Sequence, residues 1–307
     1  MTVNAFTLIT FDVDGTLVKG SGGGSDVSAH ARAFSHAVGT VLGDGTPTIP
    51  VAEAIPRHKF HGSTDGLILL RLARATLGVE PHLVAPRLDE LFSSMYEYVN
   101  ALETVDIAEG IETLPGVMDH LTTLASRKHE VICGLVTGNV EGIARRKMQA
   151  VGILEAQAFA PASEEQLTKV WPGSEHISFL GGFGSDYCSG NIDDDKHNFL
   201  DRAEQIAIAT RRVTSSLRTS TSTATGGKQL RRVVHVGDAP ADVLAAKIFS
   251  ETNQDLDLCI GMVAVATGSY SADELRLLAG EARPGRWEPV ILEKGMADPE
   301  FLKACGL

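Results

Sequence analysis

The stretch "ITFDVDGTLVKG", residues 9–20, ends an apolar run on Asp12 and Asp14 and follows them at once with Gly15 and Thr16. Ionised carboxylates are costly to remove from water unless they are paired or bind a cation. In a parallel α/β sheet, ligands bind outside the carboxyl ends of the strands. We therefore interpret residues 6–11 as a buried strand whose two terminal carboxylates hold a cation and attack a substrate.

Composition excludes several classes of partner. The chain has 27 Lys and Arg against 39 Asp and Glu, a net charge of -12 over 307 residues, so it lacks the positive charge that binding nucleic acid requires. No apolar run approaches the ~20 residues that span a bilayer. Four cysteines lie far apart without a CxxC pair, which favours free thiols in a reducing compartment. We expect a cytoplasmic monomer or homodimer that binds a small molecule, and neither nucleic acid nor a membrane.

The order of apolar runs predicts the fold class. Short runs rich in Val, Ile and Leu alternate with helical patterns, which is typical of a parallel sheet with helices on its faces. The predicted strands are residues 6–11, 131–136, 233–236 and 261–266, with 177–183 and 289–292 as weaker candidates. The sequence thus predicts an α/β protein with a Rossmann-like, doubly wound parallel sheet.

Residues 20–109 differ from the rest because helical periodicity replaces the strand-like runs. We predict a helical cap domain here, inserted after the first strand, with an α/β core formed by residues 1–19 and 110–307. The glycines of residues 20–24 would form one hinge, and residues 109–115 the other. Residues 161–175 and 191–198 are predicted loops, and the Ser/Thr-rich stretch 213–230 is predicted to be disordered.

Polar motifs follow three of the predicted strands. The first is Asp12-Val13-Asp14-Gly15-Thr16, the second is Thr137-Gly138-Asn139, and the last runs from Gly237-Asp238 to Asp242. Together, in this order, they resemble the motifs of the haloacid dehalogenase superfamily, specifically its phosphatase branch. The segment "GMVAVATGSYSADELRLLAGE", residues 261–281, resembles the one that follows the last motif in phosphatases of the phosphoglycolate type. The placement of a helical cap directly after the first motif is similar too.

That resemblance implies a phosphatase that forms an aspartyl-phosphate intermediate. Asp12 would be the nucleophile, and Asp14 would protonate the leaving group and then activate water. Asp12, Asp238 and the backbone carbonyl of Asp14 would bind Mg²⁺, with Asp242 orienting the site or reaching a metal-bound water. The remaining candidate contacts to the phosphate or the substrate are Thr16, Thr137, Gly138 and Asn139.

A third motif of this family carries a cation, and here its usual Lys-Pro pair is absent. Two residues could replace it. Arg202 opens "DRAEQIAIA", a predicted helix with Asp201 as its cap, and we favour it. Lys196 is the alternative, although its surroundings "DDDKHN" resemble an inserted loop.

Substrate choice is expected to depend on the cap. In "FHGSTDGLILL", residues 60–70, Thr64 or Asp65 either caps a helix or contacts the substrate. Thr267 and Gly268 are given a structural role beside the site. The favoured function is Mg²⁺-dependent hydrolysis of a small phosphorylated metabolite, such as phosphoglycolate or a sugar phosphate. A phosphomutase of the same fold and a non-catalytic ligand-binding relative remain as alternatives, whereas a dehalogenase would not need Asp14.

Overall fold

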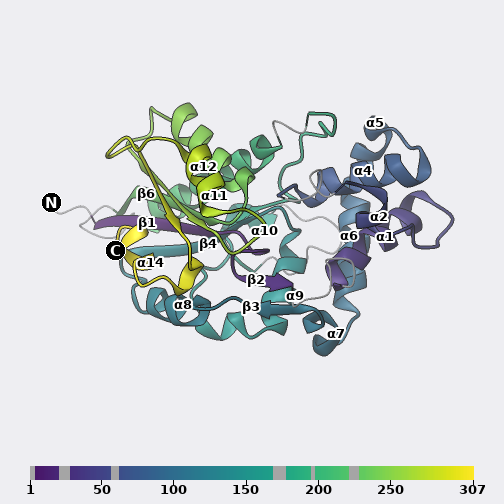
Figure 1. The fold of residues 1–307 in the computed structure, drawn as a ribbon, viewed down its shortest axis with the longest axis horizontal. Coiled ribbons are helices and arrows are strands. Elements are labelled where there is room, and N and C mark those ends of the chain that lie inside the picture. The colour runs from purple at the N-terminus through teal and green to yellow at the C-terminus, as the bar shows by residue number, and fades with distance from the viewer. Residues whose placement is uncertain (1–3, 21–27, 57–61, 169–177, 195–197, 221–227) are drawn as a thin grey trace.

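Six parallel strands form the centre of the molecule (Figure 1). The computed structural model describes residues 4–20, 28–56, 62–168, 178–194, 198–220 and 228–307. The strand order is β5-β4-β1-β6-β7-β8, which is the doubly wound order with its reversal between β1 and β6. The predicted α/β fold class is therefore confirmed. Their bounds are β1 (Asn4–Phe11), β4 (Val131–Thr137), β5 (Gly181–Phe183), β6 (Lys228–Gly237), β7 (Cys259–Val265) and β8 (Trp287–Leu292).

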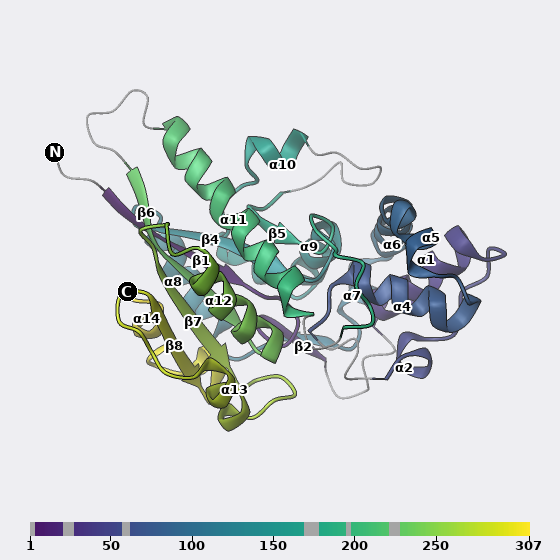
Figure 2. The ribbon, with the colours of Figure 1, turned by 90° about the horizontal axis from the view of Figure 1, so that it is seen from above.

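Helices cover both faces of the sheet, because successive side chains of a strand point to opposite faces. Ile9 and Phe11 of β1 pack in one apolar cluster with α8 (Val117–Ser126), α9 (Glu141–Ala150) and α14 (Phe301–Ala304). Leu8 packs in another with α11 (Phe199–Ser220), α12 (Pro240–Thr252) and α13 (Ala272–Ala279). Figure 2 shows α11 and α12 side by side along the sheet. Among the described helices, none combines the length and the apolar character that crossing a membrane demands.

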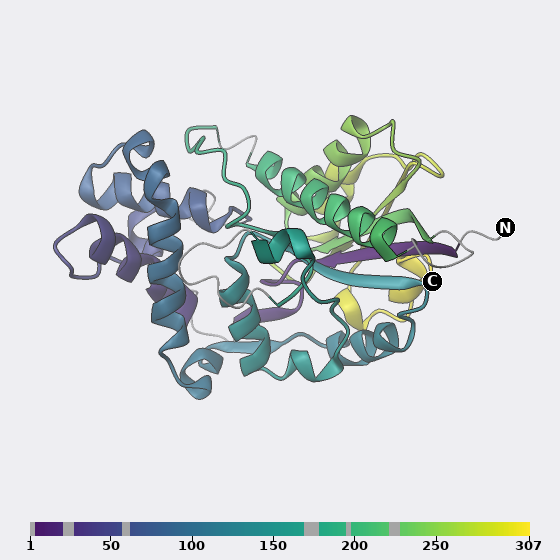
Figure 3. The ribbon, with the colours of Figure 1, turned by 180° about the vertical axis from the view of Figure 1, so that it is seen from behind.

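The described elements between β2 (Val18–Gly20) and β3 (Ile111–Thr113) are all helical. These two short strands pair with each other in antiparallel fashion, so the segment leaves and returns at one point. The helices of this segment form an apolar cluster of their own. Val140 and Ile143, at the start of α9, also pack in this cluster. Figure 3 shows them grouped at the end of the molecule away from both termini. They are α1 (Ala29–Leu42), α2 (Val51–Ala54), α4 (Asp65–Leu77), α5 (Pro81–Val84), α6 (Leu88–Asn100) and α7 (Thr104–Ala108), with the 3-10 turn η2 (Ala85–Arg87).

The Ser/Thr-rich stretch contradicts its prediction in part. Residues 213–220 are not disordered but extend α11, and residues 228–230 begin β6. Val213 and Leu217 continue the apolar stripe of this helix into the core. The hydroxyl groups of Thr214 and Ser216 donate to carbonyls one turn earlier, which satisfies them within the helix. Residues 221–227, like the glycines predicted as a hinge at 21–24, lie outside the described residues.

The predicted loops and the predicted cap Asp201 need smaller corrections. α10 (Glu164–Thr168) interrupts residues 161–175, so the first stretch is partly helical. α11 begins at Phe199, two residues before Asp201. The Asp201 carboxylate accepts a hydrogen bond from the backbone of Ser189 instead of capping the helix. The prediction was wrong because residue type alone does not reveal which backbone amide a carboxylate will meet.

Candidate active site

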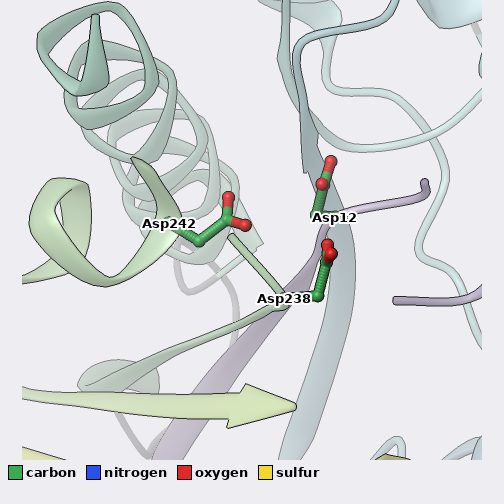
Figure 4. A group of neighbouring side chains, drawn as sticks. All are labelled: Asp12, Asp238 and Asp242. Atoms are coloured by element: carbon green, nitrogen blue, oxygen red, sulfur yellow. The ribbon is translucent and has the colours of Figure 1, made fainter. Parts of the chain in front are cut away.

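Three buried carboxylates converge where β1 and β6 end. Asp12 follows β1, Asp238 follows β6, and Asp242 lies in the first turn of α12. One oxygen from each lies within 4.8 Å of the others (Figure 4). This point is the reversal of strand order, where open α/β sheets bind ligands. The structure therefore brings together the acidic residues that the sequence placed at separate strand ends.

Arg202 lies inside this acidic group. Its Nη1 is 2.9 Å from Asp12 Oδ1 and 2.9 Å from Asp242 Oδ1, and its side chain is buried. Nη1 also approaches the backbone carbonyl of Val136. Of the two candidates for the third-motif cation, Arg202 thus reaches the predicted nucleophile. Lys196 lies outside the described residues.

Both carboxylate oxygens of Asp242 are engaged by the protein. Oδ1 pairs with Arg202 and lies 3.2 Å from His235 Nε2, while Oδ2 accepts from the backbone of Ala239. Burial alone would raise the pKa of Asp242, but Arg202 and His235 lower it. Asp242 is therefore an ionised group that orients Arg202 and the first turn of α12. These contacts favour an orienting role over direct coordination of a cation.

Asp238 has the opposite surroundings. Within the described part of the chain, no Lys or Arg forms an ion pair with it, and its polar side-chain neighbour is the Thr16 hydroxyl at 3.4 Å. Burial and the negative charges of Asp242, Asp12 and Asp14 raise the pKa of Asp238 well above its usual range. The negative charge around Asp238 thus outweighs the more distant positive charge of Arg202, and carboxylate oxygens are the ligands that Mg²⁺ prefers. Asp12 and Asp238 therefore fit a divalent cation.

Two glycines pack closely against the Asp238 side chain. Gly15 has a φ of 82°, and a Cβ atom there or at Gly268 would collide with the Asp238 side chain. The hydroxyl of Thr267 donates to the carbonyl of Gly15 at 2.6 Å, which fixes the turn after β1. Thr267 and Gly268 thus hold the walls of the site, as their predicted structural role requires.

Asp12 is buried at the bottom of the site. Burial raises its pKa despite the ion pair with Arg202, and the charges of Asp242 and Asp14 act in the same direction as burial. The hydroxyl of Thr137 donates to the Asp12 carboxylate and opposes this rise. Added positive charge beside Asp12 would stabilise the ionised form that a nucleophile needs.

The loop after β4 lies between Asp12 and the helical segment. The backbone amide of Asp65 donates to the carbonyl of Gly138 at 2.8 Å, and its carboxylate accepts from the amide of Val140 at 2.8 Å. A Cβ atom at Gly138 would lie 2.6 Å from the carbonyl of Ser63, so glycine permits this close approach. Thr64 is the N-cap of α4, its hydroxyl accepting from Leu67. Substrate contact by Thr64 or Asp65 stays a prediction.

Asp14 stands at the rim, with its side chain half exposed. Lys147 Nζ lies 2.8 Å and 2.7 Å from its two carboxylate oxygens, and Asn139 Nδ2 donates to one of them at 3.0 Å. Partial desolvation would raise the pKa of Asp14, but the charges of Lys147 and His30 and these hydrogen bonds hold it at about 2. In this arrangement Asp14 is ionised. It would have to take up a proton before it could act as an acid.

Lys147 and His235 were missed by the sequence reasoning. Lys147 follows Ile143 by four residues, and Ile143 is buried in the apolar cluster of the helical segment between β2 and β3. His235 interrupts the apolar run of β6 and contacts Thr10 and Asp242. One signal in the sequence could have revealed both residues. Each is a charged or polar residue at a position that periodicity predicts to be buried, and such groups are rarely buried without a partner.

Glu141 provides a pH-dependent contact beside the site. It is buried at the start of α9, where one carboxylate oxygen accepts from the amides of Ser178 at 2.9 Å and Phe179 at 3.2 Å. Burial raises the pKa of Glu141 from its usual 4.5 to about 7. The folded protein therefore holds a proton there that the unfolded chain releases at lower pH, and this stability is lost as pH rises through about 7.

We expect the free energy of unfolding of the wild type to fall by about 1–3 kcal/mol more than that of Glu141→Gln between pH 5 and pH 8. Urea denaturation at a series of pH values measures this difference. Glu53→Gln, at an exposed glutamate, is the matched control and should follow the wild type. Parallel pH profiles for the wild type and Glu141→Gln would contradict the assignment.

A family model for haloacid dehalogenase-like hydrolases matches residues 6–172, more than half of the chain. No curated protein sequence matches. Among solved structures, CbbY from Rhodobacter sphaeroides with bound phosphate is 15% identical, covers 100% of both chains and has a TM-score of 0.46. A conserved haloacid dehalogenase-like protein of unknown function from Agrobacterium tumefaciens is 18% identical over 98% of this chain and 100% of its own, with a TM-score of 0.39.

A third solved structure is described as a phosphoglycolate phosphatase of Lactobacillus delbrueckii, assigned provisionally. It is 16% identical over 95% of each chain, with a TM-score of 0.38. At these levels of similarity the activities of such proteins do not transfer to this chain. The match of the family model to residues 6–172 covers the first two strand-end motifs, Asp12 to Thr16 and Thr137 to Asn139. The chain belongs to the haloacid dehalogenase-like hydrolases.

Proposed function

We propose that the protein is a phosphatase that hydrolyses a small phosphorylated metabolite through an aspartyl-phosphate on Asp12. The observation that carries this proposal is the convergence of Asp12, Asp238 and Asp242 around Arg202 at the strand-order reversal. A buried carboxylate beside a fixed guanidinium suits attack on phosphorus, because the transferred phosphoryl group is anionic and needs positive charge close by.

Each residue of the site then has a role in the reaction. Asp12 attacks phosphorus, and the bond to the leaving oxygen breaks as the bond to Asp12 forms. Thr137 and the amides of the following loop bind phosphate oxygens near the start of α9. Asp14 gives a proton to the leaving alkoxide, and afterwards takes one from the water that hydrolyses the aspartyl-phosphate. Arg202 balances the negative charge of Asp12 throughout.

A magnesium ion would be held by Asp12, Asp238 and the backbone carbonyl of Asp14. The support is chemical: Asp238 is buried among carboxylates and forms no ion pair with a described Lys or Arg, whereas Asp242 pairs with Arg202 and contacts His235. When bound, the ion supplies positive charge that reduces repulsion between the carboxylate and an anionic substrate. Asp242 would keep Arg202 in place.

The proposed substrate class rests on the family resemblance and on the closeness of the helical segment to the loop after β4. Ser63 and Asp65 lie directly against Gly138 in that loop, which favours a compact leaving group, such as that of phosphoglycolate or a sugar phosphate. Closure of such a segment excludes water while phosphate is transferred to the protein. Thr64 and Asp65 are the candidates for contact with the substrate, and Thr16 and Asn139 for contact with its phosphate.

Phosphate release from a panel of small phosphate esters tests the proposal. We expect turnover in millimolar MgCl₂ and a loss of at least about 100-fold in EDTA, restored by adding Mg²⁺ in excess. Calcium added in place of magnesium is the matched control for a general effect of divalent ions on the fold, and it should restore stability without full activity. Activity that is unchanged by EDTA would contradict the assigned role of the metal.

A further inference from the structure

We propose that Lys147 is a positioning residue that sets the place of the Asp14 carboxylate for both proton transfers. This inference rests on the proposed function, since it concerns the acid and base of that reaction. Its basis is a closed group of three side chains, Lys147, Asn139 and Asp14, in which every polar atom meets another at 2.7–3.0 Å.

The contacts fix the orientation of each member. Lys147 Nζ donates to both oxygens of Asp14 and to Asn139 Oδ1, and the Asn139 amide nitrogen donates to Asp14 Oδ2. Only one orientation of the Asn139 amide satisfies both neighbours, because its oxygen has to face the ammonium group and its nitrogen the carboxylate. The acid–base group is thereby linked to the loop that is proposed to bind phosphate.

Burial distinguishes Lys147 from a substrate contact. Its side chain is 5% exposed, whereas that of Asp14 is 50% exposed. A buried ammonium group needs its anionic partner, so Lys147 stays beside Asp14. Asp14, with one side open, is the member that meets the leaving oxygen. Lys147 therefore acts on the reaction through Asp14 and does not touch the substrate.

The helix that carries Lys147 is also held by the two residues that precede Lys147. Arg145 Nη2 lies 3.2 Å from the Tyr96 hydroxyl of α6, and Arg146 Nη2 donates to the carbonyl of Leu102 at 2.8 Å. Both partners belong to the helical segment between β2 and β3. Lys147 thus projects from an element fixed by contacts with that segment, which makes it suitable for holding Asp14 within a narrow range of positions.

A double-mutant cycle with Asp14→Asn tests the inference. For 2-phosphoglycolate, Lys147→Met should lower kcat by about 10- to 100-fold, a large part of the usual effect of acid–base catalysis, with KM within about 3-fold of wild type. In the Asp14→Asn background the same substitution should cost less than about 3-fold, because the group it positions is already gone. Lys147→Arg, which keeps the charge, should recover part of the loss.

The dependence of the rate on the leaving group is a second measurement. A residue with a merely structural role would slow the reaction equally for all leaving groups. 4-Nitrophenolate departs without a proton, so its release in a single turnover should be slowed by less than about 3-fold in Lys147→Met. Lys303→Met, at an exposed lysine, is the matched control and should keep wild-type kinetics. Melting temperatures show whether each variant folds. If Lys147→Met does not fold, Lys147→Arg replaces it in the double-mutant cycle.

Two failures can be told apart. Additive effects in the cycle, a rise in KM with kcat unchanged, or equal losses for both leaving groups would overturn the inference while wild-type activity and its dependence on Asp12 stand. A wild-type protein that releases phosphate from no ester, or an active Asp12→Asn variant, would overturn the proposed function and this inference with it.

Discussion

Replacing Asp12 by asparagine should lower kcat by a factor on the order of 10⁴ or more, because the amide cannot attack phosphorus. The fold should survive, since asparagine has nearly the same size and carries no charge into a crowded site. Burial, Asp242 and Asp14 together disfavour the ionised form of Asp12 more than Arg202 favours it, and Arg202 keeps its ion pair with Asp242 when Asp12 is neutral. We expect a melting temperature no more than a few degrees below that of the wild type, measured beside steady-state phosphate release.

Two further variants make this prediction specific. Asp12→Ala guards against slow deamidation of asparagine back to aspartate and should be as inactive. Asp44→Asn changes an exposed aspartate whose described side-chain contacts are to Thr46, and should retain full activity. An Asp12→Asn protein within about 10-fold of wild-type kcat, with no trace of reversion, would exclude covalent catalysis at this residue.

Replacing Asp238 by asparagine should have opposite effects on activity and on the stability of the metal-free protein. Activity in MgCl₂ should fall by roughly 10³-fold, because the main ligand for the cation besides Asp12 is weakened. Without metal the variant should be more stable than the wild type by roughly 1–3 kcal/mol, since it removes a buried carboxylate that no described Lys or Arg pairs with. Chemical denaturation in EDTA measures the second effect.

A magnesium titration of the melting temperature completes this test. The wild-type melting temperature should rise with MgCl₂ as expected for a ligand that binds the folded state, whereas that of Asp238→Asn should hardly change. Asp44→Asn again serves as the matched control and should respond like the wild type. A wild-type protein whose melting temperature ignores Mg²⁺, or an Asp238→Asn protein less stable than wild type in EDTA, would contradict the assigned cation site.

The fold could be predicted from the sequence because its signals are local. Each predicted strand is an apolar run, and the runs at 6–11, 131–136, 233–236 and 261–266 lie within β1, β4, β6 and β7 or overlap them closely. Asp12 and Asp238 could be placed near each other because parallel strands bring their carboxyl ends to one edge. Arg202 was selected through the family resemblance. No local pattern in the sequence shows that a side chain of α11, a helix packed on one face of the sheet, extends to Asp12.

The remaining contacts depend on tertiary structure. Lys147 is 133 residues from Asp14 along the chain, and the packing of α9 brings the Lys147 ammonium group to the Asp14 carboxylate. The extension of α11 through residues 213–220 is a similar case. Ser and Thr disfavour a helix locally, but burial of Val213 and Leu217 outweighs this preference. Burial energies of this kind are decided by neighbours that are distant in sequence.

Trapping the phosphorylated protein tests the nucleophilic role of Asp12 most directly. Wild-type protein mixed with substrate and MgCl₂ is quenched in acid within milliseconds, digested, and its peptides are mapped by mass spectrometry. We expect the mass of one phosphoryl group on the peptide containing Asp12, assigned to that residue by fragmentation and absent from Asp12→Asn. A phosphoryl group on another residue, or full turnover without any labelled peptide, would contradict the proposed mechanism.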